Sequence, residues 1–479
     1  MKRSAGILMP IFSLKSKYGI GCFSKEAYDF VDFLSAAKQK YWQILPIGPT
    51  SYGDSPYQSF SSFAGNHYFI SLDDLVAEKL LKEEEIAAFN FKDDNIIDYE
   101  ELFNKRIEIL KLAFKRFKAN EEYFNFISDH DWLFDYAKYM ALKTKNNFKA
   151  LSKWQDYNLS VEDMYNLNLH RFIQFIFYKQ WFKLKKYAND KGIKIIGDLP
   201  FYASLDSADV FAYPNYFMIN DKYEALKIAG CPPDYFSKEG QLWGNPIYNW
   251  TNLRKNNYDF LRKRLSWNLQ CFDILRIDHF RAFADYYEID VNDNDARKGV
   301  WHDGPGNHFF ESLKDLINNE NIIIEDLGQI NDKVINLIKT NNFIGMKVLE
   351  FAFNYGSISD YIFHRHSKNY VLYPATHDNE TLVSWISKLN HNDLNYLKEY
   401  LDCDSDDKQR IIKSLIKHAY MSNCELLIVA LHDYLFLDDI ARINKPSTNN
   451  GNWCYRIDND LWNNELANQI ANYVKLYER

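Results

Sequence analysis

The chain has 479 residues, of which 47% are hydrophobic, and a formal charge of −8. This length allows one large catalytic domain with insertions. The mild acidity, without a long run of Lys or Arg, argues against nucleic acid and anionic membranes as partners. No apolar run approaches the roughly 20 residues that a membrane span needs. The six scattered cysteines lack zinc spacing, which predicts reduced thiols of a cytoplasmic protein and no metal site.

The first part of the chain alternates strand and helix patterns. Residues 5–12 and 41–45 are apolar runs that predict strands, and Ser24 can cap a helix between them. A long polar loop follows over 48–66, and then a short strand-like piece over 67–72. A loop of this length without periodicity is usually functional.

From about residue 73 to 190 the pattern is helical, which predicts a helical insertion subdomain. Strand patterns then return at wide intervals, with helical patterns between many of them. They cover residues 194–199, 272–278, 322–325, 347–351, 370–374 and 426–431. With the two at the start this makes eight strands, which predicts a single α/β domain over 1–479 built as a (β/α)₈ TIM-type barrel.

In this prediction the insertions between the strands are mostly helical, residues 200–270 form a second insertion, and there is no separate C-terminal β-domain. An open doubly wound sheet is the alternative. It is weakened because the sequence has neither a Gly-x-Gly-x-x-Gly turn nor a phosphate-binding P-loop.

Acidic residues stand at or near the ends of five predicted strands. They are Asp198, Asp278, Glu325, Glu350 and Asp378. Catalytic groups of such barrels lie at the carboxyl ends of the strands. This regularity favours a catalytic role for these acids.

The stretch 272–283 carries the densest group of charges. Its apolar first half leads to Arg276, Asp278, His279 and Arg281 within six residues. Burying charge is costly unless it is paired. By itself the stretch therefore fits a structural ion-pair network as well as a catalytic site.

Seven motifs together resemble the amylomaltases, the 4-α-glucanotransferases or disproportionating enzymes of the α-amylase clan. They occupy residues 53–60, 197–200, 205–210, 232–246, 276–281, 325–328 and 376–381. The resemblance runs over nearly the whole chain in the family's order and is weak only over about 80–190. It implies a barrel enzyme that uses maltooligosaccharides and glucans as donors and acceptors, with no cofactor.

The resemblance implies a catalytic role for three carboxyl groups. Asp278 would be the nucleophile, Glu325 the acid/base and Asp378 the carboxylate that holds sugar hydroxyls. Retaining cleavage of an α-glucosidic bond needs two carboxyl groups about 5–5.5 Å apart. We expect Arg276 to keep Asp278 ionised, and the isoleucines before Glu325 to raise the pKa of Glu325 by desolvation.

The resemblance also implies substrate-binding residues, among them a stacking face from Tyr57 and hydrogen bonds from His279 and His377. The predicted set is Ser55, Tyr57, Asp198, Asp234, Tyr235, Phe236, Gln241, Trp243, Arg276, His279, His377 and Asn444. The segment 232–246 is expected to overhang the barrel mouth on the acceptor side and shed water. Two other functions remain open: a non-catalytic glucan-binding barrel, and an amylase-like hydrolase with water as acceptor.

Overall fold

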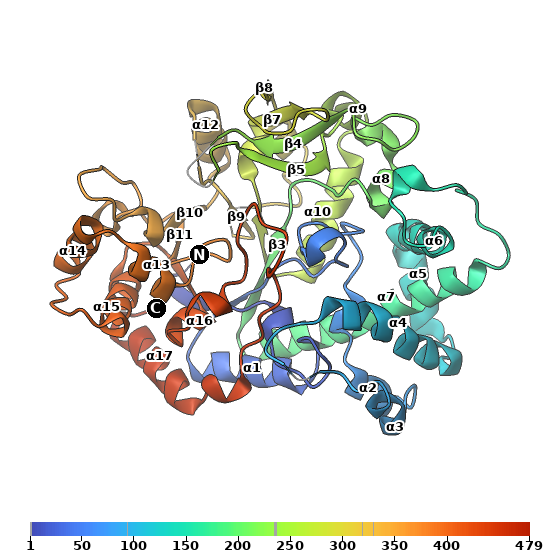
Figure 1. Cartoon of the computed structure of the whole chain (residues 1–479), viewed down its shortest axis with the longest axis horizontal. Coiled ribbons are helices and arrows are strands. Elements are labelled where there is room, and N and C mark those ends of the chain that lie inside the picture. Colours follow the sequence, from blue (N-terminus) through green and yellow to red (C-terminus); the bar gives the residue numbers. More distant parts are fainter. Residues whose placement is uncertain (1, 93, 234–236, 319, 329) are drawn as a thin grey trace.

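The computed structural model describes residues 2–92, 94–233, 237–318, 320–328 and 330–479. At its centre lie eight parallel strands (Figure 1). They are β1 (Ser4–Leu8), β2 (Tyr41–Gln43), β3 (Lys194–Leu199), β6 (Ile274–Ile277), β9 (Ile322–Ile324), β10 (Gly345–Val348), β11 (Tyr370–Tyr373) and β12 (Leu426–Ala430). Their order is β10-β11-β12-β1-β2-β3-β6-β9. A parallel bridge between Ile323 and Ile344 joins the two edges, so the sheet closes into the predicted barrel.

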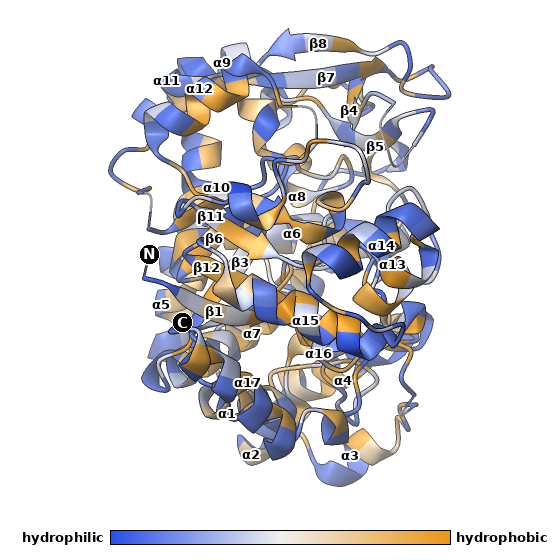
Figure 2. Cartoon of the chain, turned by 90° about the vertical axis from the view of Figure 1, so that its left-hand side faces the viewer, coloured by the Kyte–Doolittle hydropathy of each residue, from blue (hydrophilic) through white to orange (hydrophobic). Residues whose placement is uncertain are grey.

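Helices surround the barrel and also form its largest insertion. They are α1 (Lys25–Ala36), α2 (Leu72–Ala77), α3 (Glu83–Ala87), α4 (Tyr99–Arg116), α5 (Glu121–Asp129), α6 (Asp131–Lys145), α7 (Met164–Asp190), α8 (Ala208–Ala212), α9 (Trp250–Lys255), α10 (Asp259–Cys271), α11 (Asn307–Glu311), α12 (Asp332–Asn341), α13 (Leu382–Lys388), α14 (His391–Tyr400), α15 (Lys408–Met421), α16 (Leu431–Tyr434) and α17 (Asn464–Leu476). Figure 2 shows hydrophobic colours on the central strands and hydrophilic ones on much of the helical exterior.

All eight predicted barrel strands are present, but most end earlier than the apolar runs do. The run 5–12, for example, contains Pro10 and turns into a 3₁₀ helix, Ile11–Ser13. The predicted strand over 67–72 is wrong. Asn66 and Ser71 cap a 3₁₀ turn and α2 there, because their side chains accept the backbone N–H groups of Tyr68 and Asp74.

The helical insertion between β2 and β3 runs from α2 to α7, and α7 fixes the long loop 48–66. Gln174 of α7 accepts the N–H of Gly65 at 2.7 Å and donates to the Gly65 carbonyl at 2.9 Å. Gln180, further along α7, pairs with both backbone groups of Ser71 in the same way. Two buried glutamines thus satisfy four backbone groups, and they give the end of this loop a defined position.

A second, antiparallel sheet was not predicted from the sequence. It consists of β4 (Lys227–Cys231), β5 (Gln241–Pro246), β7 (Asp285–Asp290) and β8 (Val300–Asp303), in the order β5-β4-β7-β8. The prediction of mostly helical insertions missed it. Figure 1 shows this sheet at one end of the barrel, above β3 and β9. The Arg281 guanidinium lies 3.5 Å from the ring centre of Trp301, which links β8 to the chain that follows β6.

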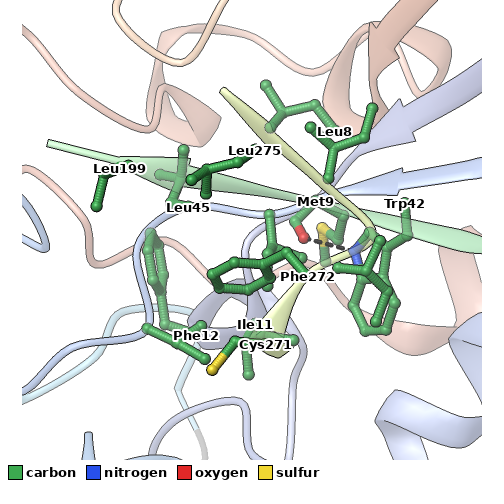
Figure 3. Close-up of a cluster of buried hydrophobic side chains, with 14 of the residues drawn as sticks. Leu8, Met9, Ile11, Phe12, Trp42, Leu45, Leu199, Cys271, Phe272 and Leu275 are labelled. Atoms are coloured by element: carbon green, nitrogen blue, oxygen red, sulfur yellow. Dashed lines mark hydrogen bonds between the residues drawn. The ribbon is translucent and has the colours of Figure 1, made fainter. Parts of the chain in front are cut away.

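The barrel wall is closely packed around Phe272 (Figure 3). A Cβ added to Gly197 on β3 would lie 2.2 Å from the Phe272 ring, so only glycine allows β3 and this ring to approach so closely. The buried Trp42 donates its indole N–H to the Met9 carbonyl at 2.8 Å. Packing of this kind holds the strand ends, and the side chains on them, in fixed positions.

Candidate active site

Strand register brings four ionisable side chains together at the carboxyl ends of β3, β6 and β9. Asp198 of β3 lies directly across from Arg276 of β6. Because side chains alternate along a strand, Asp278 projects from the same face as Arg276. On the other side Ile277 pairs with Ile324, so Glu325 follows β9 at the level of Asp278. Residues up to 127 positions apart in sequence therefore meet at one strand edge.

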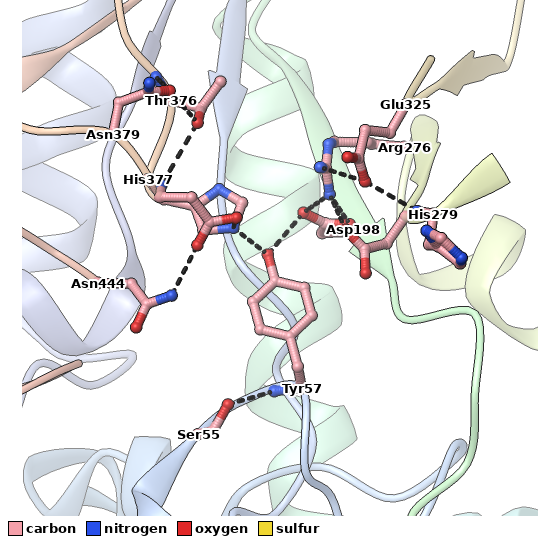
Figure 4. A network of polar contacts seen from close by, with 12 residues as sticks. Ser55, Tyr57, Asp198, Arg276, His279, Glu325, Thr376, His377, Asn379 and Asn444 are labelled. Carbon is pink, nitrogen blue, oxygen red and sulfur yellow. Dashed lines mark hydrogen bonds and ion pairs between the residues drawn. The ribbon is translucent and has the colours of Figure 1, made fainter. Parts of the chain in front are cut away.

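Arg276 binds all three carboxyl groups (Figure 4). Its Nη1 lies 2.7 and 2.6 Å from the two oxygens of Asp198 and 2.9 Å from Oδ1 of Asp278. Its Nη2 lies 3.2 Å from Oε2 of Glu325, which also accepts the backbone N–H of His279 at 2.8 Å. The Arg276 side chain is only 3% exposed, and those of Asp278 and Glu325 are 25% and 22% exposed. Both acids can therefore be reached from the cleft.

Asp278 and Glu325 form a coupled pair with opposite pKa shifts. Burial and the neighbouring negative charge of Glu325 raise the pKa of Asp278 well above its ordinary value, against the opposing effect of Arg276. Burial alone would raise the pKa of Glu325 too. Arg276, a hydrogen bond with Asp278 and the His279 N–H outweigh burial, so the pKa of Glu325 is lowered.

This result corrects the expected charge distribution. The predicted rise in the pKa of Glu325 is wrong, because this pKa is lowered. Arg276 lowers the pKa of Asp278 as expected, but burial and the negative charges of Glu325 and Asp198 outweigh it. The N–H of His279 stabilises the charged form of Glu325, a contact that the isoleucine run could not predict.

Asp378 lies in the turn after β11 and is held from both sides. Asn444 donates to its Oδ1 at 2.6 Å, and His377 Nε2 lies 3.4 Å from its Oδ2. The backbone N–H of Asn444 binds the His377 carbonyl at 3.1 Å. The predicted residues His377, Asp378 and Asn444 are thus brought together on one side of the cleft.

Tyr57 connects this group to the Arg276 cluster. Its hydroxyl donates to Oδ2 of Asp198 at 2.9 Å and lies 2.8 Å from Nε2 of His377 (Figure 4). Its ring stacks on His377, with the planes 10° apart, so one face is already covered. Ser55 accepts the N–H of Tyr57 at 3.2 Å and shapes the turn that carries this ring. The contacts of Tyr57 with Asp198 and His377 join segments that lie far apart in the sequence.

Trp243 and His279 lie side by side on the other flank of the site. Their rings are 4.7 Å apart in an edge-to-face arrangement. Gln241 accepts the indole N–H of Trp243 at 3.1 Å. His279 Nε2 is buried without a hydrogen-bond partner among the described residues, and burial lowers the pKa of this imidazole to about 4. A neutral imidazole with a free nitrogen can bind a hydroxyl group.

The other predicted residues of this flank, Asp234, Tyr235 and Phe236, lie outside the described residues. The described part of the segment 232–246 reaches the site through Trp243.

Comparisons with known proteins agree with this geometry. The sequence profile of the 4-alpha-glucanotransferase family matches residues 9–461. The chain belongs to this family. It is 42% identical to the 4-alpha-glucanotransferase of Clostridium butyricum, covering 98% of this chain and all of that one. It is 35% identical to the Thermus thermophilus 4-alpha-glucanotransferase, over 95% of each chain. The structure of the amylomaltase from Streptococcus agalactiae in complex with acarbose is 37% identical, with a TM-score of 0.96 and full coverage of both chains.

Family membership makes this chain a 4-α-glucanotransferase, an enzyme acting on glucans. A more distant amylomaltase, from Corynebacterium glutamicum, shares the fold at 17% identity, with a TM-score of 0.82 over 98% of this chain and 75% of that one. Within the described residues, no helix has the length and apolarity to cross a membrane. No cluster of three or more His, Cys, Asp or Glu in the described part of the chain could hold a metal ion.

Two residues that hold the Asp378 side of this glucanotransferase site in place were not predicted from the sequence. Arg442 donates to the carbonyls of Asn444, at 2.7 Å, and Asp378, at 3.0 Å. Asn379 accepts from Thr376 on one side and donates to Glu350 at 2.7 Å on the other. The signal for Glu350 was present, since it was among the acids at strand ends. No pattern in the sequence indicated its partner.

Proposed function

We propose that the chain transfers a segment of a 1,4-α-glucan to the 4-hydroxyl of another glucan or of glucose, by a retaining double displacement. Asp278 attacks C1 of the donor while Glu325 protonates the leaving glycosidic oxygen. The glucosyl–Asp278 ester then reacts with the acceptor hydroxyl. Glu325 takes the proton of that hydroxyl, the ester bond breaks, and both carboxyl groups return to their starting states.

The observation that carries this proposal is the contact of both carboxyl groups with one guanidinium. Nη1 of Arg276 binds Asp278 and Nη2 binds Glu325. Inverting enzymes need about 6.5–9.5 Å between the carboxyl groups to admit a water molecule. The side-chain hydrogen bond between Asp278 and Glu325 places the two groups closer than that, which supports retention.

The roles require an ionised Asp278 and a protonated Glu325 when the donor binds. The two side chains are hydrogen-bonded to each other, so the proton has a direct path. A glycosidic oxygen beside Glu325 can accept a hydrogen bond only from the protonated acid, and an electrophilic C1 beside Asp278 favours the charged form. Substrate binding thus favours the reactive arrangement of the pair.

The remaining residues are proposed to bind the glucan. Asp378, His377 and Asn444 hold hydroxyl groups of the cleaved unit, and His279 offers its free Nε2 to the same unit. Tyr57 orders both halves of the cleft, with Asp198 and Arg276 beneath it. Trp243 supplies an aromatic face on the acceptor side, where we also propose Asp234, Tyr235, Phe236 and Gln241. The acarbose bound to the related amylomaltase supports a saccharide in this cleft.

We place the reaction in the cytoplasm. Cys22, Cys271, Cys403, Cys424 and Cys454 form no disulfide among the described residues, which supports a reducing compartment.

The test is the conversion of maltotriose by the wild type and by Asp278→Asn. Transfer gives a ladder of shorter and longer glucans, hydrolysis gives glucose and maltose alone, and a binding protein gives no change. We expect the ladder from the wild type. Asp278→Asn should lose at least about 10⁴-fold in kcat, because an amide cannot form the ester. Asp259→Asn is the control, since that side chain is 54% exposed on α10. A variant that keeps more than a tenth of the activity would refute the nucleophile assignment.

A further inference from the structure

A second group of carboxyls lies behind the turn that carries His377 and Asp378. Glu350 follows β10, and its Oε2 accepts the side-chain N–H of Asn379 at 2.7 Å. The backbone N–H of Glu350 also binds the Pro374 carbonyl, at 3.3 Å, just before the turn. Glu350 therefore contacts the turn at both of its ends.

Asp433 holds the next segment of the same chain. It lies on α16 with a fully buried side chain, and its Oδ1 accepts the N–H of Leu382 at 2.9 Å. Leu382 is the first residue of α13, directly after the turn. Two carboxyl groups from different elements thus anchor the chain on both sides of Asp378.

Hydrogen bonds inside the turn connect the residue bound by Glu350 to Asp378. Asn379 Oδ1 accepts both the N–H and the hydroxyl of Thr376, at 3.0 and 2.6 Å. The Thr376 hydroxyl oxygen in turn accepts the N–H of Asp378 at 3.3 Å. The chain of hydrogen bonds from Glu350 to Asp378 is therefore continuous, and it passes through Asn379 and Thr376.

The surroundings of Glu350 favour its neutral form. Its Oε1 and Oδ2 of Asp433 are buried without hydrogen-bond partners among the described residues. An ionised carboxylate with an unpaired buried oxygen is costly. The charged groups that face Glu350 are Asp433 and Glu380, which oppose its ionisation, and Arg442, which favours it but is engaged with Glu380 and the Asp378 carbonyl. His432, beside Asp433, is kept neutral because burial lowers its pKa to about 4.

We propose that neutral Glu350 is a positioning residue for the transfer reaction: it holds the turn that presents His377 and Asp378 to the glucan, and loss of its proton disables the enzyme. This inference rests on the proposed substrate-binding role of Asp378. When Glu350 ionises, its charge adds to those of Asp433 and Glu380, while Arg442, which faces it, is already engaged with Glu380 and the Asp378 carbonyl. The charge is relieved only if the turn moves or water enters, and either change displaces Asp378.

The experiment measures kcat and KM for maltotriose transfer between pH 5 and 10. Glu350→Gln keeps an acceptor for Asn379 and cannot ionise. Its kcat at pH 6 should stay within about threefold of wild type, while the alkaline decline of kcat moves at least one pH unit upward. In Asp433→Asn the decline should move to lower pH, because a negative charge that opposes the ionisation of Glu350 is gone. Glu399→Gln, exposed on α14, is the matched control and should leave the profile unchanged.

Glu350→Leu removes the acceptor altogether. It should lower kcat more than it raises KM, by at least tenfold in kcat/KM at every pH, because hydroxyl contacts of Asp378 matter most in the transition state. If Glu350→Leu does not fold, the pH profiles of Glu350→Gln and Asp433→Asn still test the proposal. An unchanged decline in Glu350→Gln, or an upward shift in Asp433→Asn, overturns the proposal. A wild type that makes no ladder from maltotriose would instead refute the proposed function.

Discussion

Two buried carboxyl clusters lie at the mouth of this barrel, and they differ in one respect. In the first, Asp198, Asp278 and Glu325 surround the buried guanidinium of Arg276. In the second, Glu350 and Asp433 have amide and backbone N–H partners, and each keeps one unpaired buried oxygen. Burial acts on both clusters, but among the described residues the cation of the first contacts all three carboxyl groups, whereas Arg442, which faces the second, pairs with Glu380.

The cation decides what each cluster can do. Arg276 stabilises negative charge, so the pKa of Glu325 is lowered although burial opposes this. In the second cluster burial raises the pKa of Glu350 well above its ordinary value, against the opposing effect of Arg442, and that of Asp433 to about 7. The first cluster can therefore supply a nucleophile and move a proton. The second is suited to holding a turn in place.

We expect the largest effect on activity and stability from replacing Arg276, the cation that distinguishes the first cluster from the second. In Arg276→Met, Asp198, Asp278 and Glu325 lose their shared partner, and we expect kcat for maltotriose transfer to fall about 10³-fold. The free energy of unfolding, from urea titration at pH 8, should fall by about 3–5 kcal/mol, and by less at pH 5, where the acids can take up protons. Arg262→Met, which breaks a surface pair with Asp315, should cost less than about 1 kcal/mol. Equal losses at pH 5 and pH 8 would contradict this account.

Neutralising the second cluster should change stability rather than activity at neutral pH. Burial raises the pKa of Asp433 to about 7, so the folded chain keeps a proton that the unfolded chain loses near pH 4. The stabilisation from this proton is fully present below about pH 4 and is lost as the pH rises to 7. Asp433→Asn should therefore gain about 2–3 kcal/mol relative to wild type between pH 5 and pH 8. Urea titrations at both values measure the gain, and Asp259→Asn should show none. A relative loss at pH 8 would exclude the raised pKa.

We expect the smallest effect on activity from removing the Tyr57 hydroxyl, which connects Asp198 to His377. Tyr57→Phe removes the hydroxyl between Asp198 and His377 but keeps the ring stacked on His377. One neutral hydrogen bond contributes about 1 kcal/mol, so kcat/KM for maltotriose should fall about fivefold with little change in thermal stability. Tyr187→Phe removes an exposed hydroxyl that binds Asp32 and serves as the control. A loss below about twofold would show that the two sides act independently.

Much of the barrel could be predicted because its signals are local. Runs such as Ile322–Ile324 are apolar on both faces, as parallel strands inside a ring of helices must be. The antiparallel sheet escaped prediction for the opposite reason. β7, Asp285–Asp290, alternates buried and half-buried residues within a polar stretch, and one of its two partners, β4, lies more than 50 residues away. Period-two alternation over these six residues was the only available signal.

The sequence by itself determined which acids stand at strand ends, because the carboxyl ends of parallel strands always converge at one rim. It also placed Arg276 two residues before Asp278, which puts both on one face of β6. Only the tertiary structure decided where the protons lie. The deciding contacts join segments far apart in the chain. They are the hydrogen bond from the His279 N–H to Glu325, the contact of Arg276 with Asp198, and the charges that surround Glu350. A carboxyl pKa depends on those distances and on burial, neither of which a local pattern encodes.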